Sequence, residues 1–126
     1  MQIQIIIADS FARVCKKQSL DKEDIARNIF RYISGIRRKG EVELPHSPIS
    51  KSKLIKIRIR ARAADYRLLF FFFEIDNKAI PFLLRKKGTP GNNLRADLSR
   101  NEIIRWTDKV LDDIEEGKCQ WMKYRD

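Results

Sequence analysis

Four cations alternate with apolar residues in one short stretch of the chain, and their spacing suits the binding of a polyanion. The cations share one parity and the apolar residues the other: Lys56, Arg58, Arg60 and Arg62 against Ile55, Ile57, Ile59 and Ala61. In a β-strand, alternate residues point to opposite faces, so this stretch predicts one apolar and one cationic face. Same-face neighbours lie about 6.7 Å apart, and a row of like charges repels itself unless an anion lies along it. A polyphosphate such as RNA is therefore a natural partner.

The net charge of +10 is concentrated in the middle of the 126-residue chain. Residues 51–67 carry seven Lys or Arg against one acid, and residues 85–101 carry five against one, whereas residues 102–126 hold seven acids against five bases. Such clustering is typical of a nucleic-acid-binding surface; a basic surface that only aids solubility is the alternative. The apolar content of 43% and the seven Phe indicate a folded domain rather than a disordered basic tail.

The elements that must position these cations follow from the apolar periodicity. We expect strands at 3–8, 54–62, 65–75 and 79–85, helices at 10–17 and from the Asp21 cap to about Lys39, and a last helix ending near Glu116. Gly40 is the expected terminator of the second helix, and the proline-containing residues 41–52 are expected to form a loop. Phe70–Phe73 are apolar on both parities, which predicts a central strand covered on both faces.

The order β-α-α-β-β-β-α predicts one α+β domain over residues 1–116, with a small, mostly antiparallel sheet, two N-terminal helices and one C-terminal helix. Ser99 and Glu102 have the spacing of a capping box for the last helix. Residues 117–126 are expected to be a short tail.

Cys15 and Cys119 lack metal-ligand spacing, and Cys15 is expected to be a core thiol. We expect no metal and no cofactor. The apolar run at the N-terminus is too short for a signal peptide, and no segment approaches the roughly 20 apolar residues of a membrane span. A cytoplasmic protein without a membrane partner is the expectation.

The order of elements, with KIRIRARAADYRLLF (56–70) and then FLLRKK (82–87), resembles the RelE/HigB superfamily of bacterial toxins. The matching features are a basic strand, a short turn, a strand opening with the Tyr66-Arg67 pair, and the basic cluster Arg85–Lys87. The segment NNLRADLSRNEI (92–103) is similar to a HigB-type branch. The resemblance covers residues 1–116 and implies the RelE-like fold.

The resemblance implies a toxin of a type II toxin-antitoxin system, whose partners are a cognate antitoxin, mRNA and the ribosome. RelE-like members are metal-independent endoribonucleases in which the RNA 2′-OH attacks the adjacent phosphate. Such a reaction needs a base for the 2′ proton, an acid for the leaving 5′ oxygen and cations for the phosphorane charge.

By position, the resemblance assigns catalytic roles to Arg67, Lys56, Arg58 and Lys86, with Arg67 stabilising the transition state. It assigns RNA binding to Lys53, Arg60, Arg62, Tyr66, Arg85 and Lys87. Which member of the 85–87 cluster faces the site stays open. Arg58 stands where a Lys would serve better as a base, because Arg essentially never deprotonates. Lys56 or another group would then have to act as the general base.

His46 is the single histidine and a possible acid or base, although a lone loop histidine is more often a solvated bystander. Tyr66 could stack on a base or pack in the core. Trp121 and Tyr124 could dock on the domain or contact an antitoxin.

Two other functions remain open. A ParE-like toxin shares the fold but inhibits DNA gyrase without nuclease activity, and a non-catalytic module would use the cations only to bind phosphate. The Tyr-Arg pair together with residues 85–87 favours the nuclease.

Overall fold

The computed structural model describes residues 1–61, 64–87 and 100–125. Its elements in chain order are β1 (Gln2–Ala8), α1 (Asp9–Lys17), α2 (Lys22–Ile33), β2 (Val42–Leu44), β3 (Lys53–Arg60), β4 (Asp65–Phe73), β5 (Lys78–Lys86), α3 (Arg100–Glu115) and β6 (Cys119–Arg125). The expected α+β class is confirmed.

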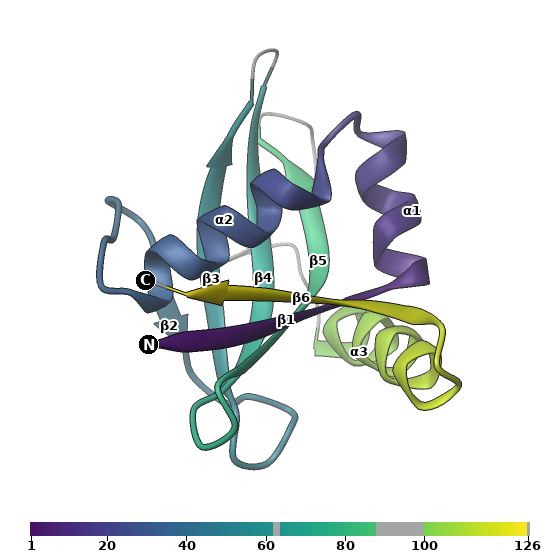
Figure 1. Ribbon diagram of the computed structural model, residues 1–126. Helices are drawn as coiled ribbons and strands as arrows, with labels where there is room; N and C mark the ends of the chain where they lie inside the picture. Colours follow the sequence, from purple (N-terminus) through teal and green to yellow (C-terminus); the bar gives the residue numbers. More distant parts are fainter. Residues whose placement is uncertain (62–63, 88–99, 126) are drawn as a thin grey trace.

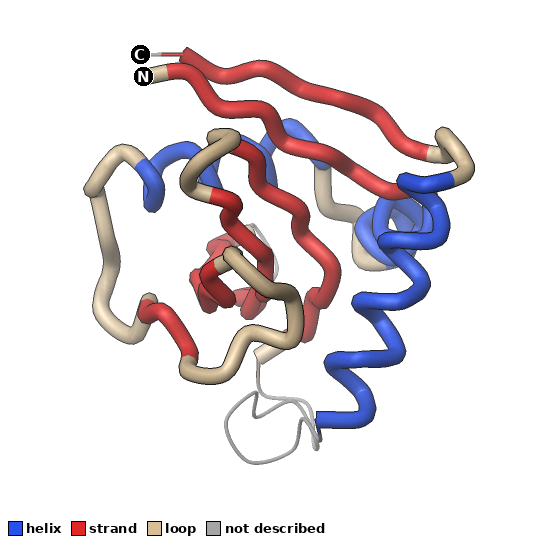
Figure 2. Tube along the Cα trace, turned by 90° about the horizontal axis from the view of Figure 1, so that it is seen from below, coloured by secondary structure: helices blue, strands red, loops and turns tan. Residues whose placement is uncertain are grey.

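The strands of the described residues form one six-stranded sheet with the order β2-β3-β4-β5-β1-β6. Neighbouring strands are antiparallel except for β1 and β5, which are parallel. Because β1 pairs with β6 from Gln2↔Arg125 to Ala8↔Cys119, the two ends of the described chain lie side by side (Figures 1 and 2). The mostly antiparallel sheet is confirmed.

The first two helices cover one face of the sheet, which we call the helix face. Helix α2 crosses the strands there (Figure 1), and its Tyr32 ring meets Phe70 of β4 edge-on at 6.3 Å. Ile25 and Ile29 of α2 are fully buried, which stabilises the fold by about 1.5–3 kcal/mol for each side chain. The opposite face carries Lys56, Arg58 and Arg67, and we call it the site face.

Strand β4 lies between β3 and β5, and the expected central strand is confirmed. Phe70, Phe71 and Phe72 are buried, whereas Phe73 is half-buried. The register between β4 and β5 shifts at Leu69/Phe70. Near this irregularity the rings of Phe71 and Phe82 stack at 4.3 Å between centroids, so the apolar core continues on the site face.

Helix α2 ends earlier than expected, so the prediction that it reaches Lys39 is wrong. Gly35 takes the left-handed conformation at φ +100°. The Gly35 N–H then donates to the Tyr32 carbonyl and the Ile36 N–H to the Arg31 carbonyl, the pair of bonds that closes a Schellman motif. Gly35, not Gly40, is therefore the terminator, and residues 36–41 are free to approach β3.

Two strands lie where none was expected. Residues 42–44 form β2 at one edge of the sheet, so the predicted loop shortens to residues 45–52. Residues 119–125 form β6 at the other edge, so the expected tail contains a strand of the same sheet. Cys15 is buried, as predicted. Arg62 and Ser99, and with Ser99 the expected capping box, lie outside the described residues.

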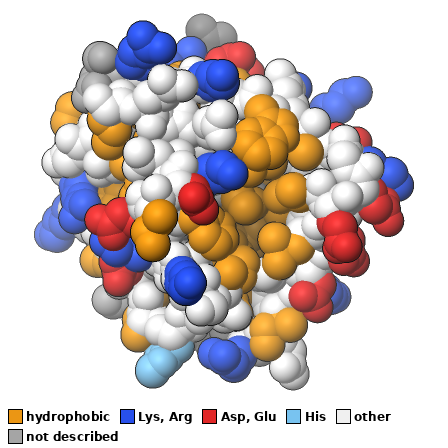
Figure 3. Space-filling view, turned by 60° about the horizontal axis from the view of Figure 1, so that its bottom comes forward, with side chains coloured by type: hydrophobic (Ala, Val, Ile, Leu, Met, Phe, Trp, Pro, Cys, Tyr) orange, Lys and Arg blue, Asp and Glu red, His pale blue; other side chains and the backbone are white. Residues whose placement is uncertain are grey.

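The basic charge does not cover every face of the molecule. Figure 3 shows a face on which hydrophobic side chains gather in a hollow between charged groups. Among the described residues, no helix is long and apolar enough to cross a membrane.

Candidate nucleic-acid interface

Three arginines from three adjacent strands form a row on the site face. Arg58 of β3 is the register partner of Arg67 of β4, which is the partner of Arg85 of β5. Directly paired residues project to the same face with Cα atoms about 4.5–5.5 Å apart. The row, which we call the arginine row, therefore places the Cα atoms of its three arginines within roughly 10 Å. Like charges placed opposite each other destabilise a sheet unless anions accompany them.

Arg58 is held by the loop that follows α2. Its Nη1 donates to the Lys39 carbonyl at 3.2 Å, and its backbone N–H donates to the Glu41 carboxylate at 2.9 Å. Arg38 Nη1 donates to the Arg58 carbonyl at 3.4 Å. The early end of α2 thus brings residues 38–41 against β3 and fixes this end of the arginine row.

Glu41 is the buried anchor of that loop, with a fully buried side chain. Its carboxylate accepts two bonds from the Arg31 guanidinium, at 2.8 and 2.7 Å, and one from the Arg38 N–H at 2.6 Å. Burial acts to raise the pKa of Glu41, but the hydrogen bonds from Arg31 and from the backbone of Arg58 and Arg38 outweigh it and lower the pKa below its usual value. Glu41 is thus held ionised.

Arg85, at the other end of the row, forms an ion pair with Glu102 of α3. Both side chains are partly exposed, at 29% and 23%. Arg67, which lies between Arg58 and Arg85 in the row, is half-buried. Its guanidinium has no acidic or hydrogen-bonding partner within the described part of the chain. Arg67 is therefore the member of the row whose guanidinium is left without a partner among the described residues.

Lys56 and Arg60 flank the arginine row on the same parity of β3. Lys56 pairs with Leu69 and is only 7% exposed. Arg60 is exposed and pairs with Asp65. The cations expected to form one ladder therefore have different surroundings: Lys56 is buried, Arg58 is held by the loop, and Arg60 is the register partner of Asp65.

Three predicted site residues lie on the helix face instead. Lys53 forms ion pairs with Glu74 at 3.1 Å and Glu43 at 4.0 Å. Tyr66 is 6% exposed and donates its hydroxyl to the Gln18 carbonyl at 3.3 Å, which fits its packing alternative. Lys86 is the register partner of Tyr66 and so shares its face.

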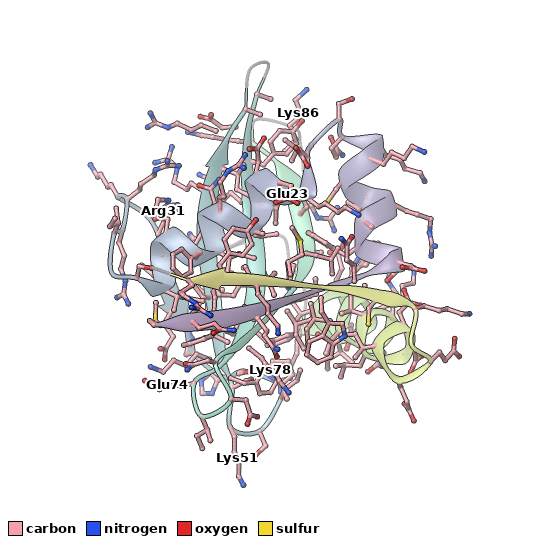
Figure 4. All side chains as sticks on the ribbon, in the orientation of Figure 1. Glu23, Arg31, Lys51, Glu74, Lys78 and Lys86 are labelled. Atoms are coloured by element: carbon pink, nitrogen blue, oxygen red, sulfur yellow. The ribbon has the colours of Figure 1, made fainter. Side chains whose placement is uncertain are left out.

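His46 also lies apart from the arginine row, whereas Lys87 follows Arg85 by two residues, just past the end of β5. His46 belongs to the loop that leads into the start of β3, and Lys53 and Arg58 are separated by five residues, or roughly 16 Å. Figure 4 shows Lys51 of the same loop at the opposite end of the molecule from Lys86. Lys87 is exposed just beyond β5, where its N–H donates to the Asp65 carbonyl at 2.8 Å.

Sequence reasoning missed the anchoring role of Glu41 and the pairing of Glu102. Glu41 follows Gly40 in a stretch read only as a loop, and its bonds depend on where α2 ends. Glu102 was considered only as part of a helix cap, and its ion pair with Arg85 of β5 was not foreseen. For both residues, the signal in the sequence was an acidic residue close to several basic ones, which is a candidate for an ion pair.

A comparison of the chain with protein-family models, with curated proteins and with solved structures finds no match. Among the described residues, no group of three or more His, Cys, Asp or Glu side chains is placed to hold a metal ion.

Proposed function

We propose that the protein is an RNA-cleaving toxin of the RelE/HigB kind, acting without a metal on mRNA at the ribosome. The observation that carries the proposal is the arginine row, with the unpartnered Arg67 at its centre. A row of cations across three strands matches the phosphates of a strand laid over the sheet, and phosphate contacts dominate the affinity of proteins for nucleic acids.

In this mechanism Arg67 binds the phosphate that is cut and stabilises the charge of the phosphorane. A base removes the proton of the 2′-OH, the 2′ oxygen attacks the adjacent phosphorus, and the 5′ oxygen leaves with a proton from an acid. The products are a 2′,3′-cyclic phosphate and a 5′-OH end. Arg58 and Arg85 hold neighbouring phosphates, and Arg60 a phosphate further along. Lys56 is the proposed proton acceptor.

The RelE-like topology is part of the same proposal. The order β1-α1-α2-β3-β4-β5-α3 supports it, and β2 and β6 would be additions at the two edges of the sheet. The proposal further includes a cytoplasmic location and a separately encoded antitoxin that blocks the site face.

The test is to induce the protein in bacteria and map new 5′ ends on mRNA. We expect cuts within coding regions, reduced about 10²–10³-fold by Arg67→Ala, which is the usual effect of removing one transition-state donor. Arg105→Ala removes an exposed cation of α3 and serves as the matched control, with cutting unchanged. Circular dichroism melts establish that both variants fold.

Two outcomes would overturn the proposal. Intact mRNA with gyrase-linked DNA breaks would indicate the ParE-like alternative. Binding of RNA without cleavage or growth arrest would indicate a non-catalytic module.

A further inference from the structure

Strand β6 leaves a long, regular sheet edge without a neighbour in the described chain. It is last in the strand order, and Figure 2 shows it at the outside of the fold. Its seven residues pair with β1 without a register shift, whereas β2 at the other edge has only three. The Tyr124 hydroxyl donates to Glu23 of α2 at 2.8 Å and holds the strand in place. Proteins usually shorten, bulge or cover such an edge because it is a template for another strand.

The register fixes which backbone groups of β6 point outward. The Asp9 N–H donates to the Lys118 carbonyl at 3.0 Å, so this residue pair is hydrogen-bonded, and the pairs that follow alternate. Gln120, Met122 and Tyr124 therefore bond toward β1, and the groups of Trp121, Lys123 and Arg125 point outward. A bond of β1 confirms this assignment. Gln4 is the register partner of Lys123, and its N–H donates away from β6, to the Asn77 carbonyl at 2.9 Å.

The same three residues supply the side-chain chemistry of this edge. Trp121 is 49% exposed, and the Lys78 ammonium lies 5.3 Å from its ring centroid. Lys123 and Arg125 are exposed. Charges alone would fit the protection of an edge against aggregation. A half-exposed Trp does the opposite, since aromatic anchors of this kind carry much of the energy of protein interfaces.

We propose that the outer edge of β6 binds an acidic, extended segment of a partner protein as an added antiparallel strand. The backbone groups of Trp121, Lys123 and Arg125 pair with the segment, Trp121 packs on an apolar residue, and Lys123 and Arg125 meet its carboxylates. A second copy of this chain fits less well, because it would bring together two molecules with a net charge of +10 each. The proposal does not depend on the proposed nuclease.

The experiment measures amide hydrogen exchange in the full chain with a synthetic peptide of alternating Glu and Val, as long as β6. At a peptide concentration ten times the dissociation constant, exchange at Trp121, Lys123 and Arg125 should slow about tenfold, following 1 + [L]/Kd. The amides of Gln120, Met122 and Tyr124 already bond to β1 and should not change. A peptide of alternating Lys and Val is the control and should have no effect.

Lys123→Pro removes one outward N–H and leaves the bonds to β1 intact, because proline is tolerated where the N–H faces solvent. It should abolish the slowing at Trp121 and Arg125, whereas Lys123→Ala should weaken it only in part. The proposal is overturned if the Lys peptide protects equally, or if Lys123→Pro retains full protection while its inward amides show an intact ladder. Protection that grows with protein concentration and needs no peptide would overturn it in favour of a second copy.

Discussion

Arginines gather at two places in this fold, and the two places treat their charge differently. Around Glu41, Arg31 and the backbone of Arg38 and Arg58 converge on one buried carboxylate. In the arginine row, the described part of the chain supplies one counter-charge for three guanidinium groups, Glu102, which binds Arg85 at one end. The first cluster is satisfied inside the fold and holds a loop. The second leaves Arg67 without a partner among the residues that the structure describes. The number of arginines does not distinguish the two clusters. The positions of the carboxylates Glu41 and Glu102 do.

The largest effect should come from breaking the satisfied cluster. Glu41→Ala leaves the Arg31 side chain, 16% exposed, without its carboxylate. Loss of one partner of a buried pair lowers the free energy of unfolding by about 3–5 kcal/mol. Urea unfolding measures it, and Arg67→Ala is the comparison, for which we expect little change or a slight gain. Equal losses in the two variants would contradict the distinction between the clusters.

A smaller effect should follow from removing the counter-charge of the arginine row. Glu102→Gln frees Arg85, and an ion pair that is partly exposed contributes about 0.2–1 kcal/mol. Affinity for a non-cleavable RNA oligonucleotide should rise about two- to fivefold. Each new phosphate contact should also steepen the dependence of log K on log salt by about 0.7. Fluorescence anisotropy at several salt concentrations gives both values; Glu115→Gln, at the far end of α3, should change neither.

The smallest effect is the pH dependence of the Glu41 cluster. The pKa of Glu41 is lowered in the folded protein, so its contribution to stability is present above the unfolded pKa of about 4.5 and is lost as the pH falls through the folded value. Urea unfolding of the wild type and of Glu41→Gln between neutral pH and pH 3 should give curves that converge at the acidic end. Parallel curves would show that the carboxylate charge contributes nothing.

Local patterning was enough to predict most of the fold. The alternation around Lys56 and the apolar run at Phe70 predicted two strands and the central place of β4. The end of α2 could not be predicted because Gly35 and Gly40 both suit a helix end, and the apolar Ile36 extended the pattern past the true one. Strand β6 was missed because its pairing partner, β1, lies at the other end of the sequence.

The site could be predicted only in part, because its composition depends on register. Arg58 and Arg67 follow from parity within their own strands. Whether Arg85 or Lys86 joins them depends on the irregularity at Leu69/Phe70, which shifts the pairing of β5 relative to β4. Lys53 was misassigned for a related reason: it lies one residue out of phase with Lys56 and so falls on the other face.

The pairing of β1 with β6 has a consequence for how the chain is made. Strand β1 is synthesised before both of its neighbours, so one edge stays open until residues 78–86 of β5 are made and the other until residues 119–125 of β6 are made. Contacts between such distant segments form slowly. The sheet can therefore be completed only after translation of residues 119–125, and until then one edge of the isoleucine-rich β1 is unpaired and can pair with other chains.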